Sequence, residues 1–239
     1  MQDIKKAFIF AAGLGTRMQP LTNNLPKPLI KVAGKCLLDY QIDLVIDAGI
    51  KQIAINCFYK AELIKGHIQK YLEKGIDIKI FEETERLETG GGLMNAKDFI
   101  NNEIIFTLNS DVILRYKNIN PLKKMAKIFD EKKHDILMLV VDKKNSVGFY
   151  DEGSFNLDDN NILNDKNKHL IFTGIEIINT NILNNYSGKK IFSLSEIFKN
   201  KLAEQKIGGV EHDDKWLHVG CLKGLEEAEK FFRASGSEI

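Results

Sequence analysis

The chain has 239 residues, of which 44% are hydrophobic and 28% charged, and its net charge is +1. This composition is typical of a soluble globular protein, and a charge near zero gives no electrostatic basis for binding nucleic acid. No apolar run approaches the roughly 18–20 residues that span a bilayer, and three scattered cysteines form no disulfide framework or CxxC metal pair. We therefore expect a cytoplasmic protein without a membrane partner.

Short apolar runs alternate with helical periods, which predicts βαβ units and a mostly parallel sheet flanked by helices. Strands are expected at 7–11, 52–56, 77–81, 103–108, 135–141, 169–178 and 216–219. Helices are expected at 37–48, 60–73, 91–100, 121–129, 194–205 and 222–232. The polar, turn-rich residues 148–163 should form a hairpin-like insertion over one end of the sheet. We expect one α/β domain over residues 1–233 and a frayed tail at 234–239.

The glycine-rich segment after the first expected strand is the most informative part of the chain. Glycine allows close backbone approach and positive φ, and successive N–H groups in such a loop bind anions. Arg17 and Lys27 follow it, and prolines on both sides of Lys27 restrict its backbone. Two cations and a loop of backbone donors suit a triphosphate. The nucleotide-binding residues predicted here are Ala11, Ala12, Gly13, Gly15, Thr16, Arg17 and Lys27.

Two familiar glycine loops fit this segment poorly. A dinucleotide-binding loop requires a third glycine where Met18 stands, and no acidic residue follows at a strand end about 20 residues later. A Walker A loop requires Gly-Lys-Ser/Thr where this chain has Gly15-Thr16-Arg17. A dinucleotide-dependent dehydrogenase is therefore disfavoured.

Polar residues also follow two other expected strands. Asp111 comes directly after an apolar strand and offers the oxygen ligand that Mg²⁺ prefers. Asn56 ends the second strand, where its amide could present a donor and an acceptor to a base. Because ligands bind at the carboxyl ends of strands in open α/β sheets, these residues and the glycine loop should converge.

The segment from Phe10 to Leu29 resembles the signature of the sugar-1-phosphate nucleotidyltransferases, approximately Leu-Ala-Ala-Gly-x-Gly-x-Arg-Met-x-Pro-Leu-Thr with Pro-Lys-Pro after it. The chain matches every specified position of this signature except the first, where it has Phe10 in place of leucine. The resemblance continues in order to the final helix. It implies a single-domain Rossmann-like nucleotide-diphospho-sugar transferase fold, with Arg17, Lys27 and Asp111 as catalytic residues and Asp111 as a magnesium ligand.

Further segments match particular branches of this family. Glu88-Thr89-Gly90-Gly91-Gly92 resembles N-acetylmuramate-1-phosphate uridylyltransferases and some mannose-1-phosphate guanylyltransferase-like relatives. This resemblance implies that Gly90 and Gly91 contact the base through backbone groups, as three glycines opening a helix would allow. It also implies a sugar pocket near Glu88, Asn109, Gly153 and Gly174, although Ser154 replaces an aspartate of the relatives.

The terminal motif is the main departure. The family reads approximately Trp-x-Asp-Val-Gly-Thr, and its aspartate is a second metal ligand, whereas this chain has His218 at that position. Imidazole is a poor ligand for Mg²⁺. Three interpretations stay open: Mg²⁺ held by Asp111, phosphates and water; a softer ion such as Mn²⁺ or Co²⁺ bound by His218; or a weakened enzyme.

These observations predict an enzyme that joins a nucleoside triphosphate to a sugar 1-phosphate and releases pyrophosphate, with Mg²⁺ as cofactor and Mn²⁺ as the alternative. UTP and N-acetylmuramate 1-phosphate are the favoured substrates. Guanylyl transfer to mannose or heptose 1-phosphate and cytidylyl transfer to phosphocholine are alternatives, as is a degenerate, non-catalytic nucleotide-sugar-binding protein. We expect a monomer or homodimer.

Overall fold

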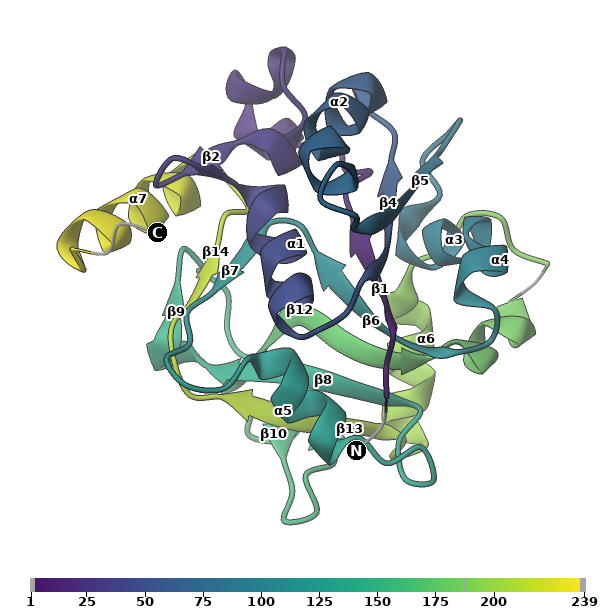
Figure 1. The fold of residues 1–239 in the computed structure, drawn as a ribbon. Coiled ribbons are helices and arrows are strands. Elements are labelled where there is room, and N and C mark those ends of the chain that lie inside the picture. Colours follow the sequence, from purple (N-terminus) through teal and green to yellow (C-terminus); the bar gives the residue numbers. More distant parts are fainter. Residues whose placement is uncertain (1–2, 187, 237–239) are drawn as a thin grey trace.

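Seven strands form the central sheet of the computed structural model, which describes residues 3–186 and 188–236 (Figure 1). Their order across the sheet is β13 (Ile207–His212), β8 (Ile136–Asp142), β12 (Leu170–Asn179), β6 (Ile104–Asn109), β1 (Lys6–Phe10), β4 (Gln52–Cys57) and β5 (Asp77–Glu82). Strand β12 is antiparallel to its neighbours β6 and β8, and the other strands run parallel. The expected mostly parallel sheet is confirmed.

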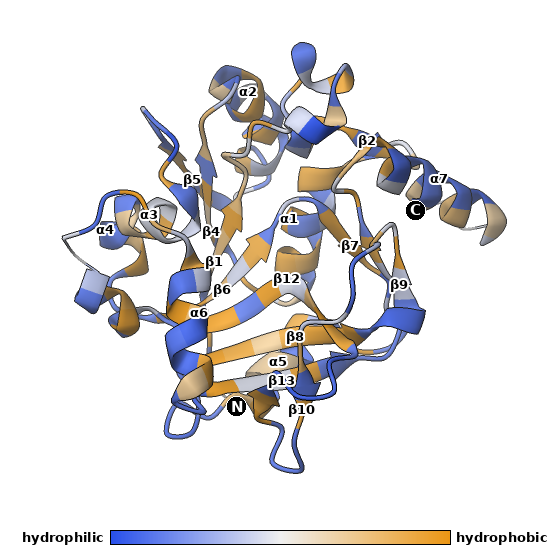
Figure 2. Ribbon diagram, turned by 180° about the vertical axis from the view of Figure 1, so that it is seen from behind, coloured by the Kyte–Doolittle hydropathy of each residue, from blue (hydrophilic) through white to orange (hydrophobic). Residues whose placement is uncertain are grey.

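Helices cover both faces of this sheet because its central strands are apolar on both sides. The first six residues of β8 are fully buried, and the strand is almost wholly hydrophobic in Figure 2. One face packs against α1 (Leu37–Asp47), α2 (Ala61–Leu72) and α5 (Pro121–Ile128). The other packs against α3 (Glu88–Asn95), α4 (Lys97–Ile100) and α6 (Leu194–Ala203). Accordingly, α1 and α5 lie in front of the sheet in Figure 1, and α6 lies in front in the reverse view of Figure 2.

Smaller sheets extend the domain beside the main one. One is a two-stranded ribbon of β2 (Lys31–Val32) and β3 (Lys35–Cys36). Another is a three-stranded sheet with the order β7 (Val112–Leu114), β14 (Trp216–His218) and β9 (Ser146–Val147). Both pack with α7 (Leu222–Ala234) around a shared hydrophobic core. The ribbon of β10 (Asn156–Leu157) and β11 (Leu163–Asn164) corresponds to the expected insertion. In its loop the Asn161 carbonyl accepts a hydrogen bond from the Gly209 N–H, so the insertion lies against edge strand β13.

The carboxyl ends of three strands meet at one place. Phe10 at the end of β1 is in register with Asn56 of β4 on one side and with Asn109 of β6 on the other. Strand order reverses at β1, which is where a crevice forms in an open α/β sheet. The loops after these strands are therefore neighbours.

Most expected elements lie within two residues of the observed ones, but the short strands β2, β3, β7 and β9 were not expected. The sequence did not reveal β13, whose Gly208 and Gly209 weaken the strand pattern but leave room for His134 and Leu157. The helix expected at 91–100 begins earlier and is interrupted at Ala96, giving α3 and α4. The last helix extends to Ala234, so the expected tail starts later, and residues 237–239 of it lie outside the described residues.

Within residues 3–186 and 188–236, no helix is both long and apolar enough to cross a membrane.

Candidate active site

A cavity of about 400 Å³ opens at the carboxyl ends of β1, β4 and β6. It brings together ten residues that the sequence singled out: Ala12, Gly13, Gly15, Thr16, Arg17, Lys27, Asn56, Glu88, Asn109 and Asp111. Six other expected site residues do not line it: Ala11, Gly90, Gly91, Gly153, Gly174 and His218. The catalytic and phosphate-binding candidates therefore converge, whereas two of the four expected sugar-binding residues, Gly153 and Gly174, do not line the cavity.

The first glycine loop turns tightly at the edge of the cavity. Gly15 has a φ of +65°, and the Thr22 hydroxyl and the Met18 N–H both donate to its carbonyl. A Cβ at Gly15 would lie 3.0 Å from the Cβ of Lys27, so glycine is needed there for conformation and for packing. Around Gly13, by contrast, a Cβ would meet nothing within 4 Å, and the space belongs to the cavity.

Lys27 and Asp111 form an ion pair across the cavity floor. Their Nζ and Oδ2 atoms lie 2.5 Å apart, and the side chains are only 12% and 23% exposed. Lys27 opens a short 3-10 turn (Lys27–Leu29) between its two prolines, and Asp111 lies between β6 and β7. Burial works against ionisation of Asp111, but the charge and hydrogen bond of Lys27 and the charge of Arg17 hold its pKa below the usual value. The cavity floor therefore carries a negative carboxylate next to a fixed cation.

His218 lies beside this pair rather than in the cavity wall. Its Nε2 is 3.9 Å from the Asp111 Oδ2, and its ring stacks on Trp216 with an interplanar angle of 7°. A Cβ at Gly220 would overlap the imidazole, so the glycine makes room for this ring. Burial lowers the pKa of His218 although Asp111 favours protonation, so the imidazole is neutral at pH 7.

Asn56 ties three segments together beneath the cavity. Its Oδ1 accepts the Ala11 N–H at 2.8 Å, and its Nδ2 donates to Glu83 Oε1 at 2.7 Å. The side chain is 2% exposed, and Glu83 is buried as well. Both polar atoms expected to face a base are thus bonded within the protein. Asn56 therefore positions the glycine loop through Ala11. The expected base contact stays a prediction, because Asn56 also lines the cavity and each polar atom of its amide can form a second hydrogen bond.

The second glycine segment also departs from its expected role. The Gly90 and Gly91 N–H groups both donate to the Phe192 carbonyl, at 2.9 and 3.1 Å, so they are not free to contact a base. A Cβ at Gly90 would overlap the Phe192 ring, and one at Gly91 would overlap the Lys190 carbonyl. These glycines allow the 190–192 segment to pack against α3. Glu88, at the start of α3, does line the cavity and accepts a hydrogen bond from Arg86.

The expected sugar-binding residues are held mainly by packing. Gly174 has a φ of +83° at an irregularity in β12, and a Cβ there would lie 2.6 Å from Asn109 Nδ2. Gly153 is buried, and a Cβ there would meet the His169 backbone at 2.6 Å. Of these positions, Asn109 and Glu88 line the cavity.

Sequence reasoning missed Glu83, Arg86 and Ser110, which all line the cavity. Glu83 directly follows β5, so its place at a strand end was the available signal. Burial raises its pKa, although hydrogen bonds from Asn56 and the Leu87 N–H oppose that shift. Arg86 adds a third cationic side chain to Arg17 and Lys27.

The donor set around Asp111 can be compared with what a divalent ion requires. One carboxylate completed by phosphate oxygens and water fits Mg²⁺, which keeps several waters and binds few protein ligands. The neutral imidazole of His218 would suit a softer ion such as Mn²⁺ or Co²⁺. The residues present therefore fit a one-carboxylate site, with His218 next to it.

A glycine loop, two cations and a carboxylate thus meet at the reversal of strand order, which is where open α/β enzymes bind their ligands. The nucleotidyl transferase family matches residues 6–235. An N-acetylmuramate alpha-1-phosphate uridylyltransferase of Caulobacter vibrioides is 32% identical over 235 residues, which cover 95% of this chain and 97% of that protein.

Two further comparisons widen this picture. The mannose-1-phosphate guanylyltransferase catalytic subunit beta of Drosophila melanogaster is 29% identical over 91% of this chain, which spans 60% of that subunit. A crystal structure of UDP-glucose pyrophosphorylase complexed with UDP-glucose shares the fold, with a TM-score of 0.79 and 17% identity over 97% of this chain and 99% of that one. The chain therefore belongs to the nucleotidyl transferase family, and it is a sugar-1-phosphate nucleotidyltransferase.

Proposed function

We propose that this enzyme transfers UMP from UTP to N-acetylmuramate 1-phosphate, giving the UDP-sugar and pyrophosphate. The observation that carries this proposal is the end-to-end match with the Caulobacter vibrioides uridylyltransferase, which covers nearly all of both chains. The reaction would belong to cytoplasmic peptidoglycan recycling. The resemblance of the Glu88-Thr89-Gly90-Gly91-Gly92 segment to this branch of the family supports the same assignment.

In this proposal, a sugar phosphate oxygen attacks the α-phosphorus of the triphosphate in line, and the bond to the β-phosphate oxygen breaks. The attacking phosphate is already an anion, so no general base is required. Lys27 bridges the α-phosphate and the incoming phosphate, and its prolines and its ion pair with Asp111 hold it in place. Arg17 and the N–H groups of the Gly13–Gly15 loop hold the β- and γ-phosphates. Catalysis is then positioning and charge stabilisation.

Asp111 would hold the divalent ion together with phosphate oxygens, and the ion would neutralise charge on the phosphates. Lys27 contacts Asp111 Oδ2, so the ammonium lies beside the position proposed for the ion and the phosphates. His218 stays neutral and packed on Trp216, with its Nε2 3.9 Å from Asp111 Oδ2.

Guanylyl transfer to mannose 1-phosphate is the second candidate. The observation in its favour is the 29% identity with the Drosophila melanogaster subunit over 91% of this chain. The catalytic residues proposed above would serve either base equally well, because they contact phosphates.

A substrate grid would test the proposal. Pyrophosphate release is measured for UTP and GTP, each with N-acetylmuramate, mannose and glucose 1-phosphates and with Mg²⁺ or Mn²⁺. We expect the highest kcat/KM for UTP with N-acetylmuramate 1-phosphate. Preference for GTP with mannose 1-phosphate would replace this proposal by the second candidate. Turnover with Mn²⁺ but not with Mg²⁺ would assign a metal-ligand role to His218.

A further inference from the structure

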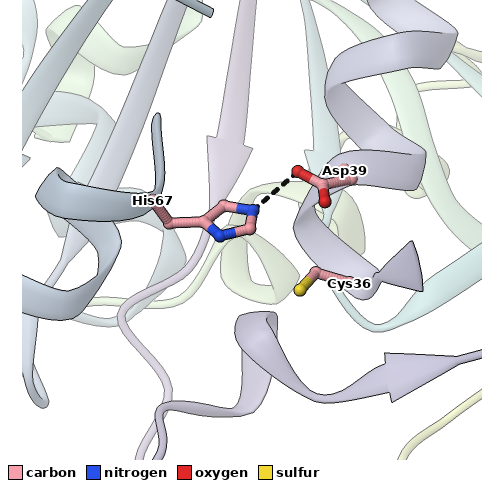
Figure 3. A group of neighbouring side chains, drawn as sticks. All are labelled: Cys36, Asp39 and His67. Atoms are coloured by element: carbon pink, nitrogen blue, oxygen red, sulfur yellow. Dashed lines mark hydrogen bonds and ion pairs between the residues drawn. The ribbon is translucent and has the colours of Figure 1, made fainter. Parts of the chain in front are cut away.

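A group of metal-ligating side chains lies outside the nucleotide cavity, where α1 meets α2. Cys36 precedes the first turn of α1, Asp39 lies within that turn, and His67 lies on α2. One ligand atom from each lies within 4.8 Å of the other two, and no other such group occurs in residues 3–186 and 188–236. Figure 3 shows the imidazole, the carboxylate and the sulfur directed toward a common space between the helices.

The separations are close to those of a coordinated ion. Zinc–ligand bonds of about 2.0–2.3 Å in a tetrahedron place neighbouring ligand atoms roughly 3.3–3.6 Å apart. In the protein His67 Nε2 lies 2.7 Å from Asp39 Oδ1. An ion would therefore part this pair slightly and draw all three ligand atoms to bonding distance, a change that side-chain torsions can provide.

The surroundings supply the charge and orientation that a site requires. Asp39 is hydrogen-bonded by Tyr71 Oη at 2.9 Å and by Lys70 Nζ at 2.9 Å, which fix its carboxylate. Such outer contacts orient metal ligands. Burial and the charge of Asp39 raise the pKa of the Cys36 thiol, so a metal ion would bind this sulfur by displacing its proton. One thiolate and one carboxylate balance the charge of a dication, and the Lys70 ammonium stays on the outer side of the Asp39 carboxylate.

The residue types indicate which ion would bind. A thiolate, an imidazole and a carboxylate together are typical of zinc-class transition metals and unlike the all-oxygen ligands of Mg²⁺. Three protein ligands leave a fourth position for water. The His67 side chain is 20% exposed, which gives an ion a route from solvent.

We propose that Cys36, Asp39 and His67 bind one transition-metal ion of the zinc class, at a site separate from the nucleotide cavity. The ion joins the start of α1 to α2. The α1 start is tied to the catalytic turn, because the Leu37 N–H donates to the Ile30 carbonyl and the Ile30 N–H donates to the Lys27 carbonyl. Metal binding therefore stabilises the support of Lys27. This inference does not depend on which sugar nucleotide the enzyme makes.

Cobalt spectroscopy on the full-length, nucleotide-free protein tests this proposal. We expect one equivalent of Co²⁺ to give a thiolate-to-cobalt charge-transfer band in the near ultraviolet and visible bands of a tetrahedral ion. One equivalent of Zn²⁺ should abolish both. Cys36→Ser should remove the charge-transfer band, and His67→Gln should weaken binding by about tenfold or more.

Matched variants assign the signal to this site. Cys57→Ala and Cys221→Ser replace the other thiols, and Asp111→Asn removes the carboxylate of the nucleotide cavity, so all three should retain the band. Zn²⁺ should raise the melting temperature of the wild type and of these controls, but not of Cys36→Ser. Absence of a thiolate band at millimolar Co²⁺, or a band that survives Cys36→Ser, would overturn the proposal. Melting curves without metal establish that each variant is folded.

Discussion

Two glycine segments border the nucleotide cavity, and they use glycine for different reasons. At Gly13 the missing side chain leaves open space that belongs to the cavity. At Gly90 and Gly91 the missing side chains leave room for Phe192 and Lys190, and the two N–H groups are bonded to the protein. The first segment is therefore shaped for a ligand and the second for packing. Similar composition does not establish similar function, because the neighbour that a glycine admits decides its role.

The largest expected effect concerns the cation that gives the first segment its function. Lys27→Ala should lower kcat by roughly 10²–10³, because it removes a fixed charge from the reacting phosphates. Steady-state pyrophosphate release measures this loss. Lys31→Ala is the control, since Lys31 is a nearby but exposed lysine, and it should retain turnover. Full activity of a folded Lys27→Ala enzyme would show that the cavity is not organised around this residue.

The second expected effect tests the packing role of the second segment. Gly90→Ala should destabilise the fold by about 1–3 kcal/mol, because the new methyl group overlaps the Phe192 ring. Urea unfolding measures the change. In a Phe192→Leu background, Gly90→Ala should lower the free energy of unfolding by a smaller amount, because the aromatic ring has been removed. Equal costs in both backgrounds would mean that Phe192 is not the reason for the glycine.

Gly13→Ala should show the opposite pattern, with a smaller effect. A Cβ at Gly13 meets nothing within 4 Å and its φ is not positive, so unfolding should change by less than about 0.5 kcal/mol. The methyl group would occupy ligand space, and KM for the nucleoside triphosphate should rise by about tenfold, or about 1.4 kcal/mol. An unchanged KM would remove the distinction between the two segments.

The smallest expected effect concerns the buried pair beneath the second segment. A Cβ at Gly92 would lie 3.1 Å from Glu83 Oε1, so this glycine admits the Asn56–Glu83 pair. Burial raises the folded-state pKa of Glu83 above its model-peptide value of 4.5, so the folded state holds the proton more tightly. Stability contributed by this group should be highest below pH 4.5 and decrease as pH rises through the folded pKa.

Urea midpoints measured from pH 4 to pH 8 check this dependence. Glu83→Gln should flatten the decrease because the titrating group is gone. Glu85→Gln alters a more exposed carboxylate two residues away and should leave the wild-type slope. A slope that is unchanged in Glu83→Gln would assign the pH dependence to other groups.

The second glycine segment also illustrates what sequence patterns miss. Glycines at a helix start predicted exposed donors, but Phe192 lies about 100 residues further along the chain and takes up those donors. Asn56 was placed correctly at a strand end, yet its amide is used by Ala11 and Glu83. In both cases the partner comes from a distant segment, so no local spacing reports it.

The sequence by itself determined the periodic elements, the mostly parallel sheet and the phosphate-binding end of the cavity. The Gly13–Gly15 loop with Arg17 and Lys27 depends on spacing along the chain, which the sequence records. Asp111 follows the end of β6, and the parallel pairing of β6 with β1 places that end next to the glycine loop. Only the tertiary structure decided that Arg86 enters the cavity, that His218 stacks on Trp216, and that Cys36 and Asp39 meet His67. The physical reason is that hydrogen bonds, ion pairs and close contacts act through space, whereas a sequence pattern records separation along the chain.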